Sequence, residues 1–155
     1  MPTYRTGDMF AHIDECDRMY VTTNATLRKD GALVMGRGAA LQAKKYNPTL
    51  PYRLGSVLKG YSEGAKICDG LPIYGLIHYT CLKIAGFQVK YHYRDRADLA
   101  LIVVSSMMLR YIASNRRRTL FLNFPGIGNG GLDIEDVKPY LDIYLPDNVH
   151  VWSLE

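Results

Sequence analysis

The sequence lacks an apolar run long enough to cross a membrane. Its longest candidate, residues Leu99 to Ile112, is interrupted by two serines and an arginine, whereas a membrane-spanning helix needs about 20 mostly apolar residues. The first residues also lack the basic and then apolar segments of a secretory leader. We therefore expect a cytoplasmic protein with no membrane partner.

Cysteine is scarce, and the spacings of metal ligands are missing. Cys16, Cys68 and Cys81 are an odd number and form no Cys-x-x-Cys pair, so we interpret them as reduced residues rather than a zinc site. No His, Asp or Glu cluster has metal-ligand spacing. The sequence therefore calls for no metal and no cofactor.

Common nucleotide-binding and hydrolase motifs are missing too. The chain has no Gly-x-x-x-x-Gly-Lys-Ser/Thr and no Gly-x-Ser-x-Gly, which argues against a P-loop NTPase and a serine hydrolase. No Gly-x-Gly-x-x-Gly stands in the setting of a Rossmann fold, which argues against a dehydrogenase.

The chain does have enough apolar sequence for a core. Its 155 residues are 48% hydrophobic and 22% charged, which fits one compact domain over residues 1–155. A formal charge of +4 mildly favours anionic ligands. We interpret the densest basic run, Arg116 to Arg118, as a solvated turn at the negative end of the preceding helix rather than a nucleic-acid patch.

Glycine is concentrated in two segments that each follow a strand-like run and precede a helix-like one. Four glycines lie between Gly126 and Gly131, and two more are Gly36 and Gly38. Such loops let backbone N–H groups approach an anion closely, beside the positive end of the next helix. The pair could grip a diphosphate from two sides; the alternative is a tight connection that needs positive φ.

Hydrophobic periodicity predicts strands alternating with helices, and hence a mostly parallel sheet covered on both faces. Asp95 and Asp133 are the expected N-caps of the last two helices. The expected strands are Thr3 to Thr6, Met19 to Thr23, Lys66 to Cys68, Ile73 to Tyr79, Leu120 to Phe124 and Val149 to Leu154. The expected helices are Gly38 to Tyr46, Tyr52 to Lys59, Arg96 to Ser114 and Ile134 to Tyr144.

These features together resemble a macrodomain, the ADP-ribose-binding α/β module, over nearly the whole chain. The matching segments are Gly7-Asp8-Met9, then Thr23-Asn24 with Val34-Met35-Gly36-Arg37-Gly38-Ala39-Ala40, and Gly126 to Asp133. The resemblance implies a three-layer α/β/α macrodomain with a central, mostly parallel mixed sheet. It is nearest the branch with ADP-ribose-1″-phosphate phosphatases and hydrolases that release ADP-ribose from glutamate or DNA. One asparagine instead of an Asn-x-x-Asn pair, and the extension Leu27 to Ala32, depart from the commonest pattern.

The resemblance also implies ligand contacts. Asp8 would accept a hydrogen bond from the adenine amino group, which a carboxylate can do and which selects an amino-purine. Asn24 would face the distal ribose; its alternative is an Asx-turn. The ligand-binding residues implied are Asp8, Met9, Asn24, Met35, Gly36, Gly38, Ala39, Gly126, Ile127, Gly128, Asn129, Gly130, Gly131 and Leu132.

Three residues are the candidates for catalysis. Asp133 corresponds to the aspartate of the branch that acts on glutamate, where it could stabilise oxocarbenium character or act as a base; the alternative is a helix cap alone. Lys90 corresponds to a lysine that follows the strand matching Ile73 to Tyr79 and forms a Schiff base with the anomeric carbon. Lys83 is the alternative residue for this role, and Asn24 is the third catalytic candidate.

The function expected from these residues is binding of ADP-ribose and hydrolysis of a derivative at the distal ribose. The substrate would be ADP-ribose-1″-phosphate or an ADP-ribosylated protein or nucleic acid. His92 could act as an acid or base near neutral pH. The alternatives are a reader that binds ADP-ribose without turnover and a nucleic-acid-binding protein.

Overall fold

The protein is built around one six-stranded sheet. The computed structural model describes residues 1–63, 66–67, 71–72, 74–79, 81–115 and 118–154. The strand order is β1-β8-β7-β2-β6-β5, and every neighbouring pair is parallel except β6 and β5. The strands are β1 (Thr3–Thr6), β2 (Arg18–Thr23), β5 (Leu76–Ile77), β6 (Ile84–Gln88), β7 (Leu120–Asn123) and β8 (Val149–Ser153).

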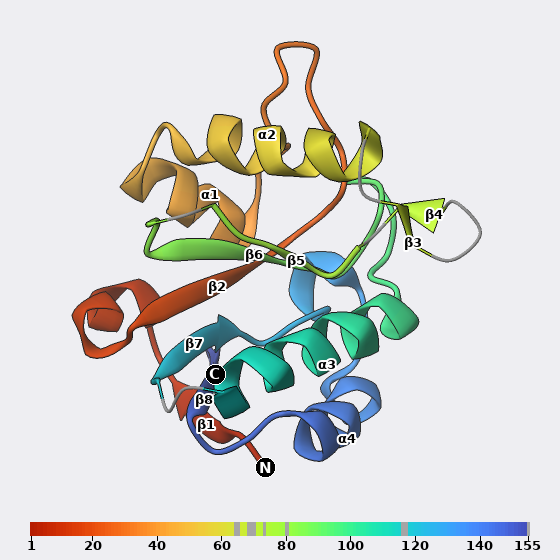
Figure 1. Ribbon diagram of the computed structural model, residues 1–155. Coiled ribbons are helices and arrows are strands. Elements are labelled where there is room, and N and C mark those ends of the chain that lie inside the picture. Colours follow the sequence, from red (N-terminus) through yellow and green to blue (C-terminus); the bar gives the residue numbers. More distant parts are fainter. Residues whose placement is uncertain (64–65, 68–70, 73, 80, 116–117, 155) are drawn as a thin grey trace.

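Helices cover both faces of this sheet, so the architecture is the expected three-layer α/β/α fold (Figure 1). Two helices lie on one face and two on the other. The first pair is α1 (Gly38–Tyr46) and α2 (Leu50–Glu63), and the second pair is α3 (Leu99–Asn115) and α4 (Ile134–Tyr144). A short antiparallel pair, β3 (Lys66–Ile67) and β4 (Leu71–Pro72), stands apart from the main sheet.

The alternation of side chains along each strand gives the protein two cores. Met19 and Val21 of β2 pack with α1 and α2, whereas Tyr20 between them packs with α3 and α4. All three are fully buried. This is the pattern of a sheet covered on both faces, in which successive side chains point to opposite sides.

The structure corrects the prediction around the fifth and sixth strands. The expected strand from Ile73 to Tyr79 is reduced to β5, and Ile73 lies outside the described residues. The sequence reading missed β6, which pairs with both β2 and β5. Its central Gly86 weakens a strand pattern, but a Cβ there would lie only 3.0 Å from Thr23 Oγ1. The close packing of β6 against β2 therefore requires glycine at this position, and the same glycine weakens the local pattern by which a strand is predicted.

Two further differences concern the start of α3 and a short 3₁₀ segment. Helix α3 is capped by Asp98, whose Oδ1 accepts a hydrogen bond from the Leu101 N–H at 3.1 Å, so the prediction of Asp95 as the cap was wrong. A 3₁₀ segment, η1 (Met9–Glu15), was not predicted. Cys68, Arg116 and Arg117 lie outside the described residues. Within the described ranges, no helix combines the length and apolarity needed to cross a membrane.

Candidate functional site

A cavity of about 1400 Å³ opens where the central strands end. Parallel strands bring their carboxyl ends to one edge of the sheet, and β2, β6, β7 and β8 all end at this cavity. Most of the expected ligand residues line it. Three do not: Met35, which is buried, Gly131 and Leu132. The catalytic candidate Asp133 does not line it either. The lining includes Asp8, Met9, Asn24, Gly36, Gly38, Ala39, Lys90, Gly126, Ile127, Gly128, Asn129 and Gly130.

The loop after β7, residues 126–132, is hereafter the second glycine loop. It contains a single 3₁₀ turn, η2 (Gly128–Gly130), and Gly126, Gly128 and Gly131 all have positive φ. Their surroundings differ. A Cβ at Gly126 would lie 2.7 Å from Ile102 Cδ1, whereas a Cβ at Gly128 would meet no atom within 4 Å. Gly126 therefore serves packing, and Gly128 leaves open backbone at the cavity.

The loop before α1, residues 34–38, is hereafter the first glycine loop, and it approaches the second. A Cβ built on Gly38 would lie 3.5 Å from Asn129 Nδ2, so the two loops approach each other closely. Gly36 has no atom within 4 Å of such a Cβ. Both loops present exposed glycines at the cavity, beside the N-terminus of α1. This arrangement suits one anion held between them.

Asn24 lines the cavity, but both the nitrogen and the oxygen of its side-chain amide also form hydrogen bonds to the backbone. Its Nδ2 donates to the Val34 carbonyl at 3.0 Å, and its Oδ1 accepts from the Thr26 N–H at 2.9 Å. The second bond is the Asx-turn considered as the alternative. Asn24 is 7% exposed, and it fixes the path of the chain between β2 and the first glycine loop. Contact with a ribose stays a prediction.

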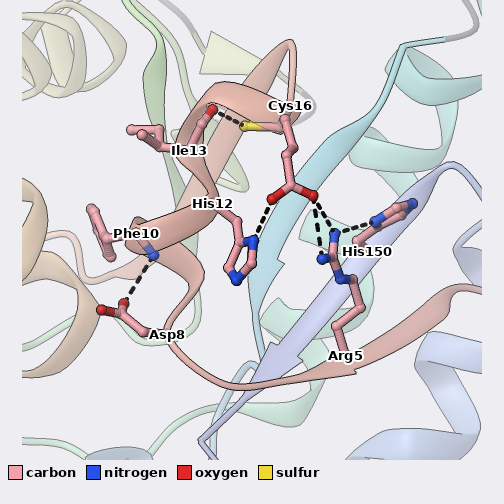
Figure 2. A network of polar contacts seen from close by, with 8 residues as sticks. Arg5, Asp8, Phe10, His12, Ile13, Cys16 and His150 are labelled. Carbon is pink, nitrogen blue, oxygen red and sulfur yellow. Dashed lines mark hydrogen bonds and ion pairs between the residues drawn. The ribbon is translucent and has the colours of Figure 1, made fainter.

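Asp8 lines the cavity where η1 begins, after the edge strand β1. Its Oδ1 accepts a hydrogen bond from the Phe10 N–H at 3.0 Å, and it is the N-cap of η1 (Figure 2). The neighbouring wall includes Trp152. The His12 ring stacks on this indole with centroids 5.0 Å apart, and the Arg5 guanidinium lies 4.1 Å from its ring centroid. Trp152 is therefore held in place by neighbours outside the cavity.

Lys90 follows β6, rather than the strand that the sequence predicted, and it lines the cavity. Its Nζ donates to the Asp95 carbonyl at 3.2 Å. Burial lowers the pKa of the Lys90 amine, the positive charge of Arg37 lowers it further, and Asp95 partly opposes both. A larger fraction of neutral amine makes a lysine a better nucleophile.

Two other candidates, Lys83 as the alternative nucleophile and His92 as an acid or base, do not line the cavity. Lys83 precedes β6 and donates from Nζ to the Cys16 carbonyl at 2.6 Å, so it lies at the amino end of that strand. His92 is exposed, and its Nδ1 accepts from the Arg94 N–H at 3.2 Å. Among the described residues, no group of three or more His, Cys, Asp or Glu side chains is arranged to hold a metal.

Asp133 occupies the N-cap position of α4, as expected, but its side chain makes no capping hydrogen bond. It is exposed, and it does not line the cavity, although the next residue, Ile134, does. Capping therefore does not use this carboxylate, and its role in catalysis stays a prediction.

The sequence reading missed several polar residues of the cavity. Asn123 ends β7; its Oδ1 accepts from the Thr22 N–H and its Nδ2 donates to Thr22 Oγ1, both at 2.9 Å. Arg37 and Arg94 line the cavity as well. The available signal for Asn123 was a polar residue directly after an apolar strand. Arg37 lies between Gly36 and Gly38, the two glycines that predict an anion site in the first glycine loop.

Comparison with known proteins supports the fold. No protein-family model and no curated protein matches the chain. The macrodomain of Mycobacterium tuberculosis DarG is 26% identical, with 98% of this chain and 97% of that one covered and a TM-score of 0.70. The macrodomain of Thermus aquaticus DarG is 24% identical over 100% and 98% of the two chains, with a TM-score of 0.69. Thermosipho africanus DarTG, solved with ADP-ribose, has a TM-score of 0.73 at 20% identity; this chain spans 97% of its own length and 41% of that one.

Proposed function

We propose that this chain, a macrodomain by its fold, binds ADP-ribose in the cavity and releases it from an ADP-ribosylated macromolecule. The adenine would lie near Asp8, and the diphosphate between the two glycine loops. The distal ribose would then face Asn24 and Lys90. Support for the ligand comes from the exposed glycines Gly36 and Gly128, which line the cavity on two loops that approach each other, and from the ADP-ribose complex of Thermosipho africanus DarTG, which has a similar fold.

One observation carries the hydrolytic part of this proposal: Lys90 lines the cavity with a lowered pKa. Its neutral amine would attack the anomeric carbon and displace the macromolecule, which leaves with a proton. The resulting glycosylamine opens to a Schiff base, and water then releases ADP-ribose and the free lysine. Such covalent catalysis divides one difficult displacement into two easier steps.

A set of substitutions tests this role of Lys90. Lys90→Met should keep ADP-ribose binding but lower turnover by at least about 10²-fold, because it removes the nucleophile. Lys45→Met, at an exposed position on α1 that does not line the cavity, is the matched control. Borohydride added during turnover should attach ADP-ribose to Lys90, as mass spectrometry of the peptide would show. Parental turnover by Lys90→Met would refute the nucleophile.

Asp133→Asn separates catalysis from capping. Because the Asp133 side chain makes no capping bond, the substitution should leave the thermal midpoint nearly unchanged. If Asp133 acts on the anomeric centre, turnover should fall by about 10²–10⁴-fold. The substrates to compare are an ADP-ribosylated glutamyl protein, an ADP-ribosylated oligonucleotide and ADP-ribose-1″-phosphate. Binding of ADP-ribose with no turnover of any of them would favour the reader.

A further inference from the structure

The segment that carries Lys90 is attached directly to the second glycine loop. We refer to residues 89–98 as the lysine loop. Arg96 donates a hydrogen bond from a terminal guanidinium nitrogen to the Gly131 carbonyl at 2.7 Å. The next residue, Ala97, donates from its backbone N–H to the Gly130 carbonyl at 2.8 Å. Two consecutive residues of one loop thus hold two consecutive carbonyls of the other.

The contact between these loops is also close in shape. A Cβ on Gly131 would lie 3.3 Å from Arg96 Nε and 3.4 Å from its Cγ, and a Cβ on Gly130 would lie 3.1 Å from Ala97 Cβ. Gly131 has a φ of +76°, a conformation that side chains disfavour. These two glycines let the second loop lie directly on the lysine loop, and neither of their carbonyls depends on ligand for its partner.

The other side of the lysine loop is attached to the chain that leads from β2 to the first glycine loop. The Ala25 N–H donates to the Tyr91 carbonyl at 2.9 Å. Thr26 Oγ1 donates to the same carbonyl at 3.2 Å and accepts from the Tyr93 N–H at 3.1 Å. The lysine loop therefore bridges the two segments that line the anion-binding part of the cavity.

We propose that Arg96 is a positioning residue that locks the second glycine loop to the lysine loop, and so sets the place of a bound diphosphate relative to Lys90. Arg96 is exposed and does not line the cavity, so it acts through the Gly131 carbonyl and not on the ligand. The effect on turnover rests on the proposed hydrolysis. The effect on loop order and on ADP-ribose binding does not require turnover.

Arg96→Met is the informative substitution, because methionine keeps much of the aliphatic contact under Gly131 but removes the donor. Water can reach this exposed site, so the fold should be retained. Amide exchange of residues 128–131 should become at least about threefold faster without ligand, as a local opening becomes easier. The dissociation constant for ADP-ribose should rise by up to about tenfold, because the ligand binds only the ordered loop and the strength of the lost bond limits the cost of ordering it. Turnover at saturating substrate should fall further.

Rescue and control variants distinguish positioning from general damage. Arg96→Lys keeps a charged donor and should recover most of the exchange protection and affinity, whereas Arg110→Met, an exposed arginine of α3, should change neither. Parental exchange rates and parental affinity in Arg96→Met would overturn the proposal, and so would equal losses in Arg96→Met and Arg96→Lys. If the parent protein shows no turnover, the proposed hydrolysis is wrong, and the amide-exchange measurement still decides the role of Arg96. Should Arg96→Met fail to fold, Arg96→Gln supplies a neutral donor for the same comparison.

Discussion

A glutamate placed at Gly128 should strongly weaken ADP-ribose binding while leaving a folded protein. The new side chain meets no atom within 4 Å of its Cβ, and Gly128 lines the cavity. The φ of +64° is the main penalty for folding, and a left-handed residue costs about 1–2 kcal/mol. For a domain of this size each kcal/mol lowers the thermal midpoint by about 2–4 °C. A decrease of roughly 2–8 °C is therefore the expected effect on stability.

The effect on binding should be larger. The introduced carboxylate would stand where the diphosphate is expected, and two unit charges about 4 Å apart repel by about 1–4 kcal/mol between bulk water and a protein surface. Lost contact with the loop N–H groups adds to this. We expect the dissociation constant for ADP-ribose to rise at least about 30-fold, measured by titration calorimetry below the midpoint of the variant.

Gly60→Glu is the matched control for charge and size. Gly60 lies in α2, is exposed and does not line the cavity, and a Cβ placed on it would also meet no atom within 4 Å. Replacing a helical glycine should stabilise the fold by up to about 1 kcal/mol. Its ADP-ribose affinity should equal that of the parent. Normal affinity in a folded Gly128→Glu protein would refute the assignment of the second glycine loop to the diphosphate.

Two further predictions concern ionisable groups. Arg37→Gln should raise the pKa of Lys90 and move its acetylation by acetic anhydride to higher pH, because the cation that helps lower this pKa is removed. Arg37→Lys keeps the positive charge and should leave the acetylation profile unchanged. Peptide mass spectrometry would measure the pH midpoint of acetylation, and an unchanged midpoint in Arg37→Gln would contradict the reasoning. Burial lowers the pKa of His78 to about 4 from 6.5, so the unfolded chain binds more protons in that window and stability falls as the pH drops through it. This group alone should make the protein about 2 kcal/mol less stable at pH 5 than at pH 7, and urea unfolding of His78→Gln should show a correspondingly smaller difference.

Local signals were sufficient for the fold class and for the two glycine loops. β1 was predicted with its observed bounds, because a strand bounded by a glycine is a local pattern. The positive φ values of Gly126, Gly128 and Gly131 are likewise a property of the loop itself. The sequence could not separate their roles, since only tertiary packing places Ile102 against Gly126 and open space beside Gly128.

The position of Lys90 was the hardest part of the site to predict, because it depends on pairing between segments far apart in the chain. Strand β6 is five residues long and contains a glycine, so no local period marks it. Its place between β2 and β5 is fixed by register, with Thr23 opposite Gln88. The buried Gln88 side chain donates from Nε2 to the Asn24 carbonyl at 3.3 Å and accepts at Oε1 from the Gly75 N–H at 2.7 Å.

The same register explains why the two catalytic candidates have such different surroundings. Lys90 follows directly on β6, whose end is bonded to Asn24 through Gln88, and so its backbone is held at the edge of the cavity. Asp133 follows the second glycine loop, reaches the surface and makes no side-chain capping bond. Lys90 is thus placed by the sheet itself, whereas any approach of Asp133 to the ribose depends on the position of the second loop. Gly131 lies two residues before Asp133. Loss of the hydrogen bond between Arg96 and the Gly131 carbonyl should therefore change the position of Asp133 relative to Lys90.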